Sequence, residues 1–226
     1  MKKRILSYLL LFTLTNGSVI AQEYMDDAAL WLNVALEKEL NNKLDLNLKL
    51  QNRINNNVTE YGQGTIDLGV TYKINKLFRV SADYMWRERR RLDGSYSTRH
   101  QFYVAAYLRK RMGKFLFVYR NRIQARYKNV MSSNEGSYAL WHDRHKFLIR
   151  YEINKRFDAY ISEELYSPLQ NMKLIGFDRS RTAVGVIYKL SKNNSIEGYF
   201  LFQKELYSDK QLRRDYVYGI TYNHRF

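Results

Sequence analysis

The sequence predicts an all-β protein, a transmembrane antiparallel up-and-down β-barrel of roughly ten to twelve strands. Apolar and polar residues alternate along successive segments, which places the apolar side chains of each segment on one face of a strand. The strands are expected to run about 11 to 14 residues, enough to cross a bilayer when they are tilted. Their connections alternate between short turns and longer loops, as expected of tight periplasmic turns and longer outer loops. A soluble β-sandwich needs no such asymmetry.

The first residues have the features of a secretory signal peptide. Lys2–Arg4 form a basic start, Ile5–Leu14 an apolar core, and Val19–Ala21 a small-x-small cleavage site. The apolar core is too short to cross a bilayer as a helix, although a retained N-terminal anchor is the alternative. We expect cleavage to remove residues 1–21 and to leave residues 22–226 as a single barrel domain in a Gram-negative outer membrane. The chain has no Cys, so neither a lipoprotein anchor nor a disulfide framework is predicted.

The first predicted strand, Ala28–Leu40, also contains good helix formers, so its pattern is weaker than those that follow. The clearest alternation is Leu44–Gln51, whose four leucines would be spread around a helix but share one face of a strand. The same pattern predicts strands at Ile66–Ile74, Phe78–Arg87, Gln101–Arg109, Phe115–Arg126, Arg144–Ile153, Phe157–Leu165, Thr182–Leu190, Ile196–Glu205 and Arg213–Phe226.

Turn-forming residues separate these strands. Short turns are predicted at residues 41–43, 75–76, 112–113, 154–155 and 192–194, and longer loops at residues 55–62, 92–97, 129–140, 167–178 and 208–212.

The number of strands is a difficulty, because this count is odd and bacterial single-chain barrels have even numbers of strands. Either Ala28–Leu40 is not a full wall strand, which leaves ten, or the acidic residues before it (Glu23, Asp26 and Asp27) hide another crossing, which makes twelve.

The C-terminal strand resembles the terminal strand that the barrel-assembly machinery recognises, so we expect this machinery to be a partner. Its apolar face ends in the predicted assembly signal, Tyr218, Ile220, Tyr222 and Phe226. His224 is a departure, because such signals usually carry another apolar or aromatic residue at that position.

Four segments, Ala28–Ile54, Arg79–Arg91, Gln101–Tyr127 and Tyr218–Phe226, resemble domain of unknown function 2490, an uncharacterised family. The resemblance covers nearly the whole predicted mature chain, and it consists of strand patterns rather than of chemical motifs. It implies an outer-membrane barrel without an assigned activity, and it transfers no site.

Charge points to the partners and to the candidate site. The formal net charge is +16 and the mean hydropathy of −0.55 excludes a helical membrane protein. An exported protein meets little nucleic acid, so we expect its partners to be outer-membrane lipid and lipopolysaccharide. With the apolar faces set toward lipid, the lumen receives a charged set: Arg79, Asp83, Arg87, Arg109, Arg120, Arg122, Arg144, Arg150, Glu152, Glu164 and Glu197.

Two interpretations of this charged lumen stay open. An Arg–carboxylate–Tyr lattice could fill and rigidify the barrel, because buried charges must pair or stay wet. Alternatively, a basic constriction could bind or pass small anionic solutes, since arginine rings favour anions. Arginines at predicted outer strand ends are interpreted as solvated rim charge or as contacts to lipopolysaccharide phosphates: Arg87, Arg89, Arg90, Arg91, Arg179, Arg181, Arg213 and Arg214.

A lipid-modifying enzyme of the acyl hydrolase or deacylase type is the alternative function. Its weak catalytic candidates are His142 or His145, with Ser162 as a luminal nucleophile. No segment resembles the motifs of such enzymes, so a structural or passive barrel is the favoured interpretation. On a strand His142 and His145 point to opposite faces, which argues against shared metal ligation. No cofactor or metal is predicted.

Overall fold

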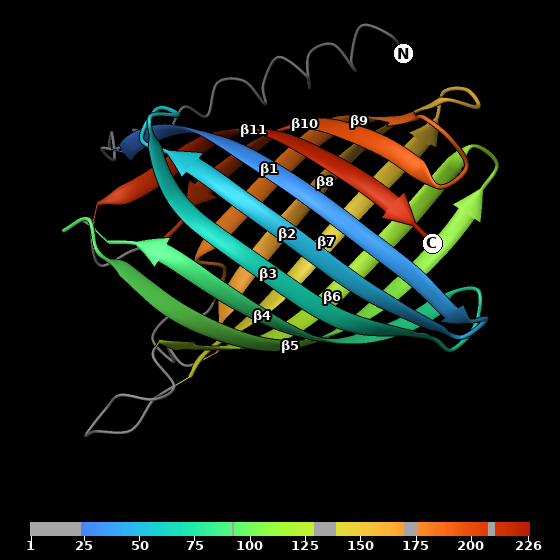
Figure 1. Cartoon of the computed structure of the whole chain (residues 1–226), viewed down its shortest axis with the longest axis horizontal. Helices are drawn as coiled ribbons and strands as arrows, with labels where there is room; N and C mark the ends of the chain where they lie inside the picture. The colour runs from blue at the N-terminus through green and yellow to red at the C-terminus, as the bar shows by residue number, and fades with distance from the viewer. Residues whose placement is uncertain (1–23, 92, 129–138, 170–175, 208–210) are drawn as a thin grey trace, which may run out of the picture.

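The computed structural model describes residues 24–91, 93–128, 139–169, 176–207 and 211–226. The predicted signal peptide, residues 1–21, lies outside this part of the chain. Strands follow one another in sequence order around one closed barrel (Figure 1). The closed sheet confirms the predicted all-β barrel. Across the described ranges, we find no helix that is long and apolar enough to cross a membrane.

The described residues form eleven strands, most of which extend beyond the predicted segments into the predicted loops. Their bounds are β1 Tyr24–Asn41, β2 Leu44–Asn55, β3 Glu60–Lys73, β4 Phe78–Arg90, β5 Tyr96–Met112, β6 Phe115–Lys128, β7 Leu140–Glu152, β8 Phe157–Pro168, β9 Arg179–Lys189, β10 Asn194–Glu205 and β11 Leu212–Arg225.

Strand parity separates the outer wall from the lumen. On β2, Leu46 and Leu50 are exposed on the outer wall, whereas Asp45 on the opposite face is 2% exposed. Apolar side chains therefore face outward, where lipid would cover them, and polar side chains are enclosed. This inverts the arrangement of a soluble protein and puts the chemistry inside.

The two ends of the barrel differ, and we call them the turn end and the loop end. The turn end holds the short β1–β2, β3–β4, β5–β6, β7–β8 and β9–β10 connections together with the C-terminus (Figure 1). Asparagines fix two of these turns. The Asn75 side chain accepts from the backbone N–H groups of Leu77 and Phe78, both at 2.8 Å. In the β7–β8 turn, Asn154 accepts from those of Arg156 and Phe157 in the same way.

The predicted range of ten to twelve strands is confirmed, but the expected even number within it, ten or twelve, is wrong, because the barrel closes with eleven. Ten neighbouring pairs are antiparallel, and β1 pairs with β11 in parallel over fourteen residue pairs. An odd number of strands linked by hairpins makes the first and last strands run in the same direction. The segment Ala28–Leu40 is thus a full wall strand, and the acidic residues before it lengthen that strand instead of adding a crossing.

Charged residues hold this parallel seam at both ends. At the loop end, two nitrogens of Arg214 donate to the two carboxylate oxygens of Asp26, each at 2.7 Å. At the turn end, Arg225 Nη2 lies 3.2 Å from Glu37 Oε1 and 2.9 Å from Glu39 Oε2. A bidentate arginine pair adds geometric specificity to its charge, so these contacts help to fix the register of the seam.

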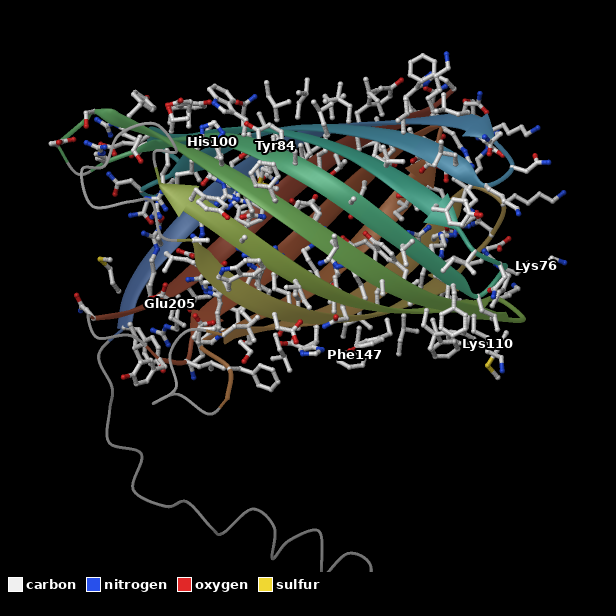
Figure 2. The ribbon with its side chains drawn as sticks, turned by 90° about the horizontal axis from the view of Figure 1, so that it is seen from below. Lys76, Tyr84, His100, Lys110, Phe147 and Glu205 are labelled. Carbon is white, nitrogen blue, oxygen red and sulfur yellow. The ribbon has the colours of Figure 1, made fainter. Side chains whose placement is uncertain are left out.

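Aromatic side chains gather on the outer wall. Tyr84 and His100 lie side by side there, with Tyr84 Oη 2.7 Å from His100 Nδ1 (Figure 2). The predicted assembly-signal residues of β11 are also exposed on this wall: Tyr218, Ile220, Tyr222 and Phe226. His224 lies against Phe226, with ring centroids 4.3 Å apart. The imidazole ring therefore takes the place of the apolar or aromatic side chain that assembly signals usually carry at this position.

Candidate functional site: the charged lumen

One large cavity runs along the inside of the barrel, with a volume of about 1260 Å³. At the turn end its wall includes Lys155 and Lys192, which belong to the β7–β8 and β9–β10 turns. Toward the loop end its wall includes Arg89 and Arg179, at the loop-side ends of β4 and β9. The described side chains therefore leave a space along most of the lumen instead of filling it.

The wall of this cavity is strongly basic. Among the described lining residues, eighteen are Lys or Arg and eight are Asp or Glu, an excess of ten positive charges. A passage lined by one sign of charge and enclosed by low-dielectric walls focuses the electric field and concentrates ions of the opposite sign. The lumen is therefore suited chemically to anions.

Most of the predicted luminal residues lie on the cavity wall: Asp83, Arg87, Arg120, Arg122, Arg144, Arg150, Glu164 and Glu197. Arg79, Arg109 and Glu152, which lie near the turn-side ends of β4, β5 and β7, are not on this wall. The Glu152 side chain is 40% exposed there, and Arg111 Nη1 lies 3.1 Å from its Oε2 atom.

Glu164 is the centre of an ion-pair network inside the barrel, and its side chain is 8% exposed. Its Oε1 atom accepts from Arg120 and, at 2.8 Å, from Arg144 Nη2. Arg181 Nη1 lies 4.0 Å from Oε2, and Tyr166 Oη donates to that oxygen at 3.2 Å. Strand register brings these groups together, because Glu164 faces Arg181 and Arg144 faces Tyr166. Three arginines share one carboxylate, so the network keeps a positive charge.

Tyrosines hold two other luminal carboxylates. Tyr103 Oη donates to Asp67 Oδ2 at 2.6 Å, and Tyr160 Oη donates to Glu197. The guanidinium of Arg122 lies 3.8 Å above the Tyr103 ring. A tyrosine hydroxyl donates a hydrogen bond to the carboxylate but carries no charge, so it holds the acidic group in place without using a luminal Lys or Arg as its partner.

Two glycines let tyrosine rings lie flat on the inner wall. A Cβ atom at Gly219 would come within 1.9 Å of the Tyr199 ring, and one at Gly185 within 2.7 Å of Tyr160. Asn33 Nδ2 donates to Tyr199 Oη at 3.2 Å and holds the ring across the seam. Gly in a strand commonly marks such a close approach, and here it keeps bulky rings out of the passage.

Five arginines of the predicted rim line the cavity, and Arg87 and Arg89 are two of them. Arg179, Arg181 and Arg213 line the cavity, because parity at the loop-side strand ends points them inward. Arg214 has the opposite parity and pairs with Asp26 on the outer side of the seam. Arg181 in particular belongs to the Glu164 network. Its position close to the predicted loop at residues 167–178 had indicated a place on the rim instead.

The catalytic candidates do not come together. Ser162 is 3% exposed and belongs to the inner face of β8, whereas His145 lies on the outer wall of β7. Both ring nitrogens of His145 already have partners, with Tyr119 Oη 2.8 Å from Nδ1 and Asp143 Oδ2 3.2 Å from Nε2. His142 lines the lumen but lies opposite the loop-side end of β8, well beyond Ser162. A nucleophile and base need direct hydrogen-bond reach, so the geometry lends the enzyme alternative no support.

An unpredicted polar cluster lies on the outer wall, near the middle of β6, β7 and β8. Asn121 Nδ2 donates to Asp143 Oδ1 at 2.5 Å, and Asp143 also contacts His145. On the neighbouring strands, Thr182 Oγ1 donates to Glu163 Oε2 at 2.5 Å. Glu163 lies opposite Phe147, which projects outward from the barrel (Figure 2). The parity of Asp143 and Glu163 along their strands could have revealed them, since both share the parity of the apolar face.

No metal centre is evident in the part of the chain that the structure describes. There, no group of three or more His, Cys, Asp and Glu side chains is arranged to hold a metal ion.

Comparison with known proteins gives a fold and a family. The β domain of the Bordetella autotransporter BrkA aligns with a TM-score of 0.52 and 9% identity, covering 83% of this chain and 86% of that one. A NanC porin aligns with a TM-score of 0.49 and 14% identity, covering 88% of this chain and 99% of that one. A bacterial polysaccharide outer membrane secretin aligns with a TM-score of 0.49 and 8% identity, covering 82% of this chain and 63% of that one.

At these identities the BrkA likeness shows the fold alone. No curated protein matches the sequence. A family described as a protein of unknown function, DUF2490, matches residues 28–213. This confirms the resemblance inferred from the strand patterns, and the chain belongs to the DUF2490 family of β-barrel proteins.

Proposed function

We propose that this protein is an outer-membrane channel whose basic lumen binds and passes small anions. The observation that carries the proposal is the cavity of about 1260 Å³ along the barrel, with an excess of ten positive charges on its wall. The barrel fold, shared with an autotransporter β domain, supports a place in the outer membrane.

The wall offers anions a substitute for the water that they lose. Lysine and arginine N–H groups line the cavity from the turn end to the loop end, so an anion meets donors along its path. Cations meet repulsion over the same path, except near the luminal carboxylates. Rings of Arg and Lys give anion selectivity in pores for this reason.

The test is conductance of the purified, refolded protein in a planar lipid bilayer, with a KCl gradient across it. We expect discrete channels whose reversal potential shows a preference for chloride over potassium. Absence of conductance, or a preference for potassium, would refute the proposal.

Two lysine variants separate luminal charge from charge elsewhere. Lys146 lines the cavity and has no carboxylate at ion-pair distance among the described residues, whereas Lys110 projects from the outer wall near the turn end (Figure 2). We expect Lys146→Gln to lower the chloride preference and Lys110→Gln to leave it unchanged, because each removes one charge but only the first faces the passage.

A further inference from the structure

Five arginines form a ring around the loop-side part of the lumen, and we call them the arginine ring: Arg53, Arg87, Arg126, Arg144 and Arg181. They come from β2, β4, β6, β7 and β9, and all five line the cavity. Arg87 is repelled by Arg126, Arg181 and Arg144, and Arg53 by Arg181 and Arg87. The guanidinium groups therefore act on one another across the lumen rather than along one strand.

Three members of the arginine ring lack an acidic partner. Glu164 serves Arg144 and Arg181, but in the described part of the chain no carboxylate lies at ion-pair distance from Arg53, Arg87 or Arg126. The Nε atoms of Arg87, Arg126 and Arg144 are buried and find no acceptor among these residues. Unpaired enclosed charges and unused N–H donors both cost free energy, so the ring has unfilled capacity to bind an anion.

Aromatic rings near the arginine ring are already covered. Arg53 lies 3.7 Å and Arg181 5.4 Å from the centroid of Trp31, which is 7% exposed. Arg144 and Arg181 lie 4.3 Å and 4.9 Å from the centroid of Tyr166. Guanidinium groups occupy these aromatic faces, so a sugar or base has no platform there on which to stack. Recognition at this level must rely on charge and on N–H donors.

We propose, building on the channel function above, that the arginine ring is a binding site for multiply charged oxyanions of the phosphate class. Guanidinium groups match phosphate oxygens in paired N–H···O bonds. An oxyanion with several charges and oxygens engages donors from two or more strands at once, whereas chloride offers a single charge and no such geometry. The ring faces the aqueous lumen, so its ligand is free in solution and not a lipid head group.

The experiment measures block of the KCl current by inorganic pyrophosphate, with acetate as the singly charged comparison. We expect pyrophosphate to block reversibly at a concentration at which acetate does not. In the double variant Arg87→Gln with Arg126→Gln, the half-blocking concentration should rise at least tenfold. The double variant Lys110→Gln with Arg111→Gln is the matched control, because it also removes two positive charges, but at the turn end and outside the cavity wall. Gel mobility with and without heating checks that each variant is folded.

The outcomes distinguish this site from the channel proposal. Chloride selectivity without pyrophosphate block, or block that survives in the double variant, overturns the arginine ring site and leaves the channel function standing. If the protein conducts nothing, the channel function fails, and calorimetry of the detergent-folded protein decides on the site. Heat of pyrophosphate binding that disappears in the double variant then supports the site, and absence of heat overturns it.

Discussion

Replacing Glu164 with Gln should destabilise the barrel by about 3–5 kcal/mol, the cost of removing one partner from a buried ion pair. Gln keeps the size and one acceptor oxygen but removes the charge that Arg120 and Arg144 contact directly and that Arg181 contacts at 4.0 Å. The three guanidinium groups are at most 16% exposed, so water compensates them poorly. The free energy of unfolding is measured by urea titration of the protein in lipid vesicles, followed by tryptophan fluorescence.

Glu197 provides the control. It is also luminal, but it accepts a hydrogen bond from the Tyr160 hydroxyl, and no Lys or Arg lies at ion-pair distance from it among the described residues. Glu197→Gln removes a charge without stranding an arginine, so we expect a loss of about 1 kcal/mol, typical of a single hydrogen bond. Equal losses for the two variants, or a loss below about 1 kcal/mol for Glu164→Gln, would contradict the account of a shared ion-pair network.

Three further predictions address the wall. Gly219→Ala should cost about 1–3 kcal/mol of overpacking against Tyr199, whereas Gly198→Ala, which meets nothing within 4 Å, should be nearly neutral in the same urea titration. Glu163→Leu should stabilise the barrel in vesicles by about 1–2 kcal/mol, because a lipid-facing carboxylate is costly, and a loss of stability would show that another surface covers it. Cysteines at Leu32 and Ile220, paired in the parallel seam, should form a disulfide on oxidation, whereas Leu32 with Tyr222, two residues out of register, should not.

The faces of the strands could be predicted because parity is local. Along β2 the sequence alternates with a period of two, and Asp45 and Leu46 therefore lie on opposite sides of the wall. The same rule placed most of the luminal arginines, and it placed His142 and His145 on opposite faces. It needed no knowledge of which strand lies beside which.

What could not be predicted depends on contacts between distant strands. The pattern of Ala28–Leu40 does not predict that this strand pairs with β11, because a strand needs the same apolar outer face beside a parallel neighbour as beside an antiparallel one. The odd number of hairpin-linked strands settles the direction, and the pairing of Asp26 with Arg214, which are distant in the chain, helps to fix the register. Likewise Glu164 meets Arg120 only through the register of three successive strands.

The distribution of carboxylates gives the arginine ring its significance. The chain places acidic partners beside arginines at the loop end, where Arg213 pairs with Asp27 and Arg179 lies 3.3 Å from Glu205. It also places Glu164 among the arginines on β6, β7 and β9. Arg87 and Arg126, between these levels of paired charge, have no such partner among the described residues. A lumen built for rigidity alone would gain from a carboxylate there, since unpaired enclosed charge destabilises the fold. Its absence is what an anion-binding passage requires, because a resident carboxylate would occupy the donors that the solute uses.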